Sequence, residues 1–410
     1  MNREIDVRKF GVSGDGVTLN TEALQKAVDS LEYGDTLVFS DGCYVTGTIA
    51  LKSNITLKIE KDAQICASRN IAHYRANEFY HNEFHETVSL IYALDAENIR
   101  FTGGGSIQLS GDAFMNFGEY GIDASVDKST VTKETAEQCV VCRRERPTQP
   151  IFFNNCRNIR FDNIFIFNSP CWTLTFSNCE DIEINNIFID NHPRIPNNDG
   201  LHFTSSKNIR VTNSTFLCGD DCIAATCITN REGICENIEI SDCLMRSRSA
   251  AVRFGHLYSK VRNAVVRDLR VAVSNRAVCI FAGNDGFVDN IKLENIIAES
   301  RIFSGNWWGK GEGFVVCSEN TNGRISGITF KNCSFAEENP SVIAGKGICN
   351  VKLEKCRFKK ISGNAHDFYR NKLDLAPNIG SLKSAAFKPD DKLYMLNINK
   401  EEVILSGTDI

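Results

Sequence analysis

One short pattern returns along most of this chain: an Asn or Asp, an apolar residue, any residue, and a second apolar residue. Copies of the pattern begin at Asn54, Asn98, Asn158, Asp181, Asn208, Asn237, Asn263, Asn290 and Asn350. From residue 158 to residue 290 the copies are 23, 27, 29, 26 and 27 residues apart. Alternation with a period of two predicts strands that bury one face. A repeat of this length, with several short strands in each copy, predicts a solenoid.

Polar pairs separate the apolar runs inside each copy, and such pairs are typical of the corners of a coil. Examples are residues 162–163, 185–186 and 212–213. The Leu-x-x-Leu-x-Leu spacing of leucine-rich repeats is absent. A β-sandwich would have turns about every 8–12 residues and would lack this long repeat. The sequence therefore predicts an all-β fold, a right-handed parallel β-helix in which each coil adds one strand to each of a few sheets.

The whole chain, residues 1–410, is expected to form a single β-helix domain. Residues 1–35 are expected to cap its N-terminal end, because Asn20 or Thr21 opens an amphipathic helix with Leu24 and Val28 on its apolar face. Residues 36–360 carry the coils. Residues 361–410 lose the repeat, and we expect this tail to pack along the outside of the solenoid.

Composition narrows the range of partners. The net charge is −5, the pI is near 5.9 and no basic run occurs, so neither nucleic acid nor a membrane surface is an expected partner. No apolar stretch is long enough to cross a bilayer, and the missing apolar leader favours a cytoplasmic location. The 17 cysteines lie mostly in strand-like runs and are expected to be reduced core thiols. Nothing in the sequence sets the oligomeric state.

Three acidic residues stand just before two short apolar runs. Asp199 precedes one run, and Asp220 and Asp221 precede the next, 22 residues later when counted from Asp199 to Asp221. If these 22 residues make one coil, the carboxylates lie side by side on one surface. Cleavage of a glycosidic bond needs such a set, with one group to protonate the leaving oxygen and another to activate water.

The wider sequence around these acids resembles a known family. The opening segment, residues 10–18, is similar to that of pectin-active β-helices. Residues 168–172 (NSPCW), 197–200 (NNDG) and 219–222 (GDDC) resemble successive motifs of the polygalacturonase family, glycoside hydrolase family 28. The resemblance covers residues 5 to 360. It implies an inverting hydrolase that acts on α-linked galacturonate-type or related oligosaccharides.

The resemblance also assigns roles. Asp220 would be the general acid, Asp199 and Asp221 would position and deprotonate the water, and Asn197 would contact the substrate. Three carboxylates close together cannot all ionise easily, so one of them is expected to hold a proton near neutral pH; the sequence does not say which. Inverting hydrolysis requires no metal, so no metal and no cofactor are expected.

The chain departs from the family where the family binds the sugar carboxylate. Ala250 stands where the family has the histidine of a Gly-His-Gly motif, and the family's Arg-Ile-Lys motif aligns with the run from Val278 to Phe281. Arg253 and Arg276 are candidate replacements for these cations, or they only neutralise the acids. His256 is a candidate replacement for the histidine, or a solvated residue past a strand end.

Two further segments carry candidate substrate contacts. Trp307 and Trp308 would wall a sugar subsite if both are exposed, since aromatic faces stack on sugars. The loop that follows them carries Lys310 and Glu312, and Glu312 either bonds a sugar hydroxyl or is only a charged loop residue. Trp172 is either a platform at the other end of the cleft or a filler. The bulky loop around Trp307 favours an exo-acting pocket.

Two rival functions remain open at this point. A polysaccharide lyase or epimerase on the same scaffold commonly uses a calcium ion among carboxylates, which the three aspartates would bind. A glycan-binding solenoid without catalysis is the other. In all three cases the expected partner is an oligosaccharide, and its sugar and linkage are not determined by the sequence.

Overall fold

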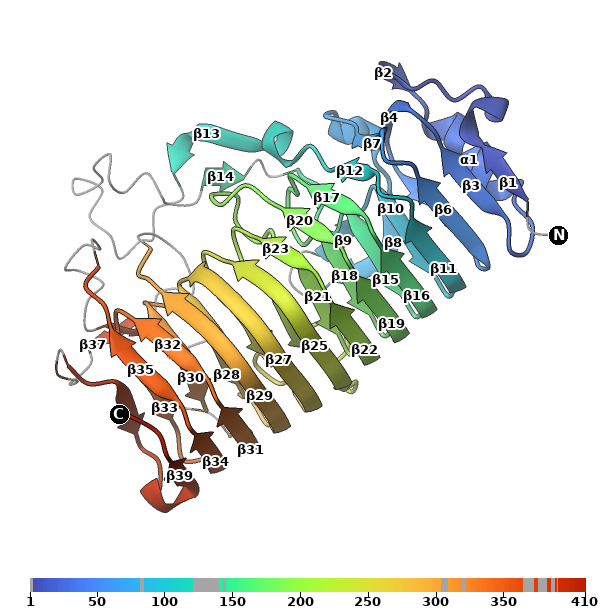
Figure 1. The fold of residues 1–410 in the computed structure, drawn as a ribbon. Helices are drawn as coiled ribbons and strands as arrows, with labels where there is room; N and C mark the ends of the chain where they lie inside the picture. Colours follow the sequence, from blue (N-terminus) through green and yellow to red (C-terminus); the bar gives the residue numbers. More distant parts are fainter. Residues whose placement is uncertain are drawn as a thin grey trace.

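Successive repeats lie one above another as parallel strands. Ile159 pairs with Ile182 in the next repeat, and Ile182 pairs with Ile209 in the one after, so the register follows the repeat. Figure 1 shows the strands stacked along one axis, with the two chain ends at opposite ends of the stack. The predicted parallel β-helix is confirmed. The computed structural model describes residues 3–81, 85–120, 140–142, 145–303, 309–318, 322–363, 372–374, 382–384, 388 and 390–410.

Within these residues the parallel strands form two large sheets. The first, with eleven strands, contains β5 (Ile49–Ala50), β10 (Ile91–Leu94), β15 (Ile151–Asn154), β18 (Leu174–Ser177), β21 (Leu201–Thr204), β24 (Ile223–Thr226), β26 (Ala250–Phe254), β28 (Arg276–Phe281), β30 (Glu312–Cys317), β33 (Ser341–Ala344) and β38 (Leu393–Leu396). It is called the acid sheet below, because the three aspartates precede two of its strands.

The second sheet has 22 strands, bends around the rest of each coil and is called the outer sheet below. Its strands are β1 (Glu4–Asp6), β2 (Asp15–Leu19), β3 (Thr36–Phe39), β4 (Gly42–Thr46), β6 (Ile55–Ile59), β7 (Ala63–Ala67), β11 (Glu97–Thr102), β12 (Ser106–Gln108), β16 (Arg157–Asp162), β17 (Phe165–Phe167), β19 (Glu180–Asn185), β20 (Phe188–Asp190), β22 (Lys207–Thr212), β23 (Thr215–Leu217), β25 (Cys235–Arg246), β27 (Lys260–Ser274), β29 (Phe287–Ser300), β31 (Arg324–Lys331), β32 (Ser334–Glu337), β34 (Ile348–Glu354), β35 (Arg357–Lys360) and β39 (Val403–Ser406).

Short elements lie outside the two sheets. Antiparallel pairs join β8 (Ala76–His81) to β9 (His85–Val88), β13 (Met115–Tyr120) to β14 (Val140–Cys142), and β36 (Lys372–Asp374) to β37 (Leu382–Ser384). Single 3₁₀ turns are η1 (Val7–Phe10), η2 (Ile71–His73), η3 (Gly111–Phe114) and η6 (Lys400–Glu402). None of the described helices is both long and apolar enough to cross a membrane.

The Asn or Asp that opens each repeat occupies a corner of the coil. Asn158 has a φ of 53° and Asn208 a φ of 57°, in the left-handed region that Asn tolerates better than most residues. The corner side chains also bond from coil to coil: the Asn158 amide donates to Asn98 at 2.6 Å, and that of Asn290 donates to Asn263 at 2.8 Å. Backbone sterics and this ladder together explain why the pattern begins with Asn or Asp.

The interior is filled by stacked apolar side chains that continue from coil to coil. Phe153, Phe176 and Phe203 occupy matching positions of β15, β18 and β21, with ring centroids 5.4 Å apart at each step. All three are fully buried. This packing fixes the spacing of the coils, and with it the spacing of the residues on the outer face of the acid sheet.

The N-terminal helix forms as predicted. The helix α1 (Thr21–Asp29) buries Leu24, Ala27 and Val28 at the N-terminal end of the stack (Figure 1). Asn20 stands at its N-cap position, but its side chain bonds the backbone of Ser13 instead of the helix.

Two details correct the expectations. The strands β38 and β39 pair with β33 and β34, so residues 393–406 add another coil beyond residue 360 instead of lying along the outside. Cys43 and Cys66 form a disulfide, so the expectation that all cysteines are reduced is wrong for this pair. Their positions are neighbours across the parallel strands β4 and β7, which brings the two sulfurs together. The other described cysteines are free and mostly buried.

Candidate active site

The three aspartates lie at the entrances of two neighbouring strands. Asp199 stands two residues before β21, and Asp220 and Asp221 stand just before β24. Leu201 is in register with Ile223, and the N–H of Gly200 donates to the carbonyl of Asp221 at 2.9 Å. The 22 residues between Asp199 and Asp221 therefore make one coil, which places the acids side by side at one edge of the acid sheet.

A buried histidine holds Asp199. His202 points outward from β21, because its neighbours Leu201 and Phe203 turn into the core. Its Nδ1 lies 2.9 Å from Oδ2 of Asp199, and its Nε2 lies 3.1 Å from Oγ1 of Thr226. The imidazole is completely buried, so two polar partners and close packing fix its orientation. The contact with His202 thus fixes the direction of the Asp199 carboxylate.

Asp220 is held by backbone groups and carries a raised pKa. Its carboxylate accepts the N–H of Asn197 at 3.2 Å and the N–H of Asp221 at 2.9 Å. The hydroxyl of Ser247 donates to its carbonyl at 2.7 Å. Burial, together with the charge of Asp221, raises the pKa of Asp220 from 3.8 to about 7, although Arg253 acts in the opposite direction. A pKa near 7 allows Asp220 to hold a proton close to neutral pH.

Asp221 is paired with a cation. Its Oδ2 lies 2.7 Å from Nε of Arg253, and its Oδ1 accepts the N–H of Ala250 at 3.0 Å. Burial lowers the pKa of Arg253, but the attraction of Asp221, Asp199 and Asp220 outweighs it and leaves that pKa raised. Arg253 therefore neutralises part of the acid set instead of standing open to a sugar carboxylate.

A second ion pair continues along the same edge. Arg276 pairs in register with Ala250 on one side and Glu312 on the other, and its Nη2 lies 3.4 Å from Oε1 of Glu312. Both side chains are at most 3% exposed. Oε2 of Glu312 accepts the N–H of Lys310 at 2.6 Å, and the Lys310 ammonium donates to the carbonyl of Gly309. Arg276 and Glu312 therefore pair with each other and Lys310 bonds the neighbouring backbone, while the contact of these three residues with a sugar stays a prediction.

The structure also describes two other predicted contacts, Trp172 and His256. Trp172 is only 2% exposed and stacks on His202 with 3.7 Å between ring centroids, so it is a filler behind the acids and offers no sugar platform. His256 follows the far end of β26, and the end of this strand lies roughly 13 Å from Ala250. Burial and the charge of Arg253 lower the pKa of His256, and its predicted role beside the acids stays a prediction. Trp307 and Trp308 lie outside the described residues.

Asn197 supports the site from its own loop. Its side-chain oxygen accepts from Nη2 of Arg146 at 3.0 Å, while its N–H bonds Asp220. Arg146 also donates to the carbonyls of Pro170 and Pro196, at 2.7 and 3.0 Å, and so ties together the loops that enter β18 and β21. The backbone of Asn197 therefore positions Asp220, and the predicted contact of this residue with the substrate stays a prediction.

Sequence reasoning missed Arg146, Ser247 and His202. Arg146 lies in a segment without the repeat, and no local pattern marks it. No feature of the sequence distinguishes Ser247 from other serines at the corners of the coils. His202 had a detectable signal, because it stands three residues after Asp199 at an outward position of a predicted strand.

Further cations lie on the loops that carry the acids. Burial lowers the pKa of His192, and Arg194 and Arg248 lower it further, so these three groups are close enough to interact. The guanidinium of Arg248 stands over the ring of Phe303, with Cζ 4.0 Å from the ring centre. Arg248 lies between Ser247, which bonds Asp220, and Ser249. Two guanidinium groups and the carboxylate of Asp112, which acts on His192 in the opposite direction, therefore lie near the rim beside Asp220.

Comparison with known families decides the relationship. The model of glycosyl hydrolases family 28 matches residues 74–301, which is more than half of the chain and includes all three aspartates. The chain belongs to glycosyl hydrolase family 28. Residues 4–72 of this family 28 protein match a second model, rhamnogalacturonase A/epimerase, pectate lyase-like.

Individual relatives agree with this assignment. The exo-poly-alpha-D-galacturonosidase of Dickeya chrysanthemi is 28% identical over 251 residues, which cover 53% of the family 28 chain and 41% of the relative. A probable polygalacturonase of Vitis vinifera is 26% identical over 255 residues, covering 58% and 47%. The match thus spans less than half of each relative. A hyperthermoactive exopolygalacturonase from Thermotoga maritima has the same fold, with a TM-score of 0.65 at 21% identity over 99% of the chain and 92% of that structure.

Proposed function

We propose that this family 28 protein is an inverting, exo-acting glycoside hydrolase of α-linked galacturonate-type oligosaccharides. One observation carries the proposal: three buried carboxylates share one edge of the acid sheet, and one of them, Asp220, has a pKa raised to about 7. A general acid must be protonated at the working pH, and a pKa near that pH is the best compromise between protonation and proton transfer. The exo-acting part rests on the name of the Dickeya relative.

In the proposed reaction Asp220 donates its proton to the glycosidic oxygen as the bond to the anomeric carbon breaks. Asp199 and Asp221 hold a water on the opposite face of the sugar and accept its proton as the oxygen attacks. The ion pair with Arg253 and the contact with His202 suit this role, since each fixes one acceptor oxygen in place. One proton leaves Asp220 and one arrives at the pair, so exchange with solvent restores the enzyme.

We propose that the sugar carboxylate contacts Arg194 and Arg248. Arg248 sits beside the loop that holds Asp220, and Arg194 sits on the loop that carries Asp199. A guanidinium there would bind a carboxylate in a bidentate manner.

Product analysis by NMR tests the proposal on a panel of galacturonate and neutral α-linked oligosaccharides of equal length. We expect single residues released from one end, with the anomeric configuration inverted at first appearance. Retained configuration would overturn the assigned roles, and internal cuts in long chains would overturn exo action. Asp220→Asn should lose activity by about 10²-fold or more, the usual contribution of a positioned acid.

The same panel separates the sugar carboxylate from general binding. Arg248→Met should raise KM for galacturonate oligomers about tenfold and leave KM for any neutral substrate unchanged. Arg270→Met, which replaces an exposed arginine on β27 of the outer sheet, is the matched control. Equal effects of the two substitutions would contradict a specific contact.

The lyase or epimerase alternative receives less support. The epimerase-type match is confined to residues 4–72, whereas the aspartates stand at positions 199–221. Two of the three carboxylates are engaged, Asp221 with Arg253 and Asp199 with His202, and a calcium ion would have to displace these partners. Ultraviolet-absorbing unsaturated products, or loss of activity with a chelator, would favour that class.

A further inference from the structure

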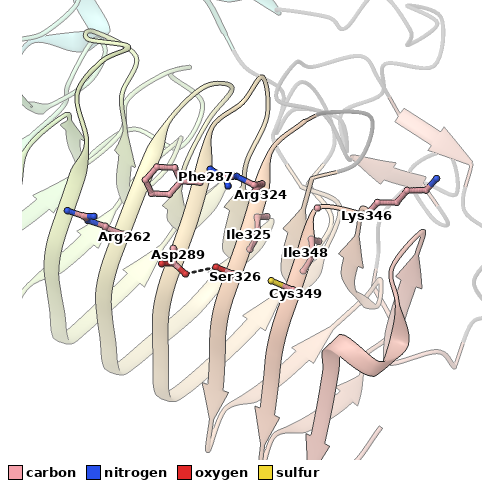
Figure 2. Close-up of a pocket in the computed structure, with 10 residues that line it drawn as sticks. Arg262, Phe287, Asp289, Arg324, Ile325, Ser326, Lys346, Ile348 and Cys349 are labelled. Carbon is pink, nitrogen blue, oxygen red and sulfur yellow. Dashed lines mark hydrogen bonds between the residues drawn. The ribbon is translucent and has the colours of Figure 1, made fainter.

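A pocket of about 550 Å³ opens on the outer sheet, where the strands β27, β29, β31 and β34 begin (Figure 2). The aspartates precede strands of the acid sheet, so the pocket and the candidate active site belong to different sheets. Nothing in the proposed hydrolysis uses this pocket.

The repeat itself builds the walls of the pocket. Arg262, Asp289, Ser326 and Cys349 form one row, each in register with the next across four strands. Phe287 and Arg324 form a second row two residues earlier. The residues between the rows turn into the core, so both rows face outward from a rigid surface.

The charges in this pocket do not balance. Arg262 has a carboxylate partner outside the pocket, Glu236, at 2.6 Å. Asp289 accepts from the hydroxyl of Ser326 at 2.5 Å, drawn as the dashed line in Figure 2. Arg324 and Lys346 are exposed, and no carboxylate of the described residues lies within 4.0 Å of either. In a chain with a net charge of −5, this concentration of positive charge favours an anion.

The pocket also offers a ring and hydroxyl-binding groups. Phe287 is half-buried beside Arg324 in the second row, and Figure 2 shows the Arg324 head directed toward this ring. An aromatic face accommodates the C–H face of a sugar, the Arg324 guanidinium suits its carboxylate, and Asp289 with Ser326 suits hydroxyl groups. Lys346 extends away from Arg324 in Figure 2 and adds positive charge at the other end of the pocket. Phosphate would use the cations alone and leave the ring unused.

We propose that this pocket binds a uronate residue of an acidic oligosaccharide, as an accessory site separate from the aspartates. The choice of sugar class rests on the proposed function, whereas the site itself rests on the pocket. An accessory site that holds one part of a long chain raises the effective concentration of the rest near the protein.

Alkylation of Cys349 reports directly on this pocket. Cys349 is the one exposed thiol among the free cysteines that the structure describes, and it lies in the first row. We would treat the intact protein with iodoacetamide and follow the Cys349 peptide by mass spectrometry. A galacturonate oligomer should slow its alkylation, whereas a neutral oligomer of equal length should not. The Asp220→Asn background prevents hydrolysis during the measurement.

Variants decide whether the protection is specific. The double substitution Arg324→Ala with Lys346→Ala should raise the oligomer concentration needed to protect Cys349 about a hundredfold, which is about tenfold for each cation removed. Arg270→Ala with Lys292→Ala removes two exposed cations of the same sheet outside the pocket and should leave protection unchanged. Equal losses in both double variants, or no protection by any acidic oligomer, would overturn the site.

Two further arms identify the ligand. Inorganic phosphate or a single-stranded oligonucleotide that protects Cys349 as well as the oligomer would overturn the sugar assignment. The experiment distinguishes failure of this site from failure of the proposed function. Protection that depends on Arg324 without any hydrolysis of galacturonates would support the pocket and refute the hydrolase. Hydrolysis of galacturonates without any protection would support the hydrolase and refute the pocket.

Discussion

Replacing Asp220 by Asn should make the protein more stable at alkaline pH while removing activity. The pKa of Asp220 rises from 3.8 in the unfolded chain to about 7 in the folded protein, which is ~3 units. Since one unit corresponds to about 1.36 kcal/mol, ionising the buried carboxyl costs the folded state about 4 kcal/mol above pH 7.

The sign follows from proton binding. As pH rises above about 4, the unfolded chain releases this proton first, so stability falls until the folded carboxyl also ionises near pH 7. Asn carries no charge and escapes this loss. Its single side-chain oxygen cannot accept both N–H groups that now bond Asp220, those of Asn197 and Asp221, which costs about 1–2 kcal/mol.

The two contributions give a test with a change of sign. At pH 8 we expect Asp220→Asn to be about 2–3 kcal/mol more stable than the wild type, and at pH 4.5 slightly less stable. Denaturant unfolding at both pH values, followed by circular dichroism, measures this difference. A variant whose stability relative to wild type is the same at the two pH values would refute a raised pKa at Asp220, and with it the reason for choosing this residue as the acid.

Three other substitutions test neighbouring parts of the structure. His202→Ala should lower kcat about 10²-fold with little change in KM, because it frees Asp199 from its buried partner; steady-state kinetics with the preferred oligosaccharide measures both. Glu312→Gln should destabilise the fold by about 3–5 kcal/mol by leaving the Arg276 charge buried, which thermal or denaturant unfolding would show, and an unchanged midpoint would contradict a buried pair. Phe203→Ala should cost about 3–5 kcal/mol in the same assay, since it opens the aromatic stack.

The sequence was sufficient for the architecture because the repeat is a local property. The corner at Asn158 has a left-handed backbone and bonds Asn98 of the preceding coil, and the strand after it alternates apolar and polar residues. Each coil is therefore recognisable from its own sequence. The same register placed Asp199 and Asp221 on adjacent coils. The repeat fails as a guide at the end of the chain, where β38 and β39 form a coil without the opening Asn or Asp pattern.

Contacts between side chains were harder to predict. An outward position on a strand was interpreted as an exposed position, which is wrong for Arg276 and Glu312 because the two neutralise each other and are covered. Arg146 reaches the site from a segment without any repeat, so only the folded chain brings it to Asn197. Periodicity therefore gives the row and the face of a residue, whereas the partner of a charged side chain depends on loops that have no period.

The histidine of this site, His202, stands at an unexpected position, and its burial limits its part in proton transfer. Ala250, where the family resemblance leads one to expect a histidine, contributes only its N–H to Asp221. His202 approaches the acids from β21, the strand that Asp199 precedes, and it is completely buried among Asp199, Thr226 and the ring of Trp172. Both ring nitrogens of His202 already bond protein groups, so the proposed mechanism gives it no proton transfer to the sugar. In that mechanism Asp220 protonates the leaving group, so the alkaline limb of kcat should follow the ionisation of Asp220 and should persist, at a lower rate, after substitution of His202.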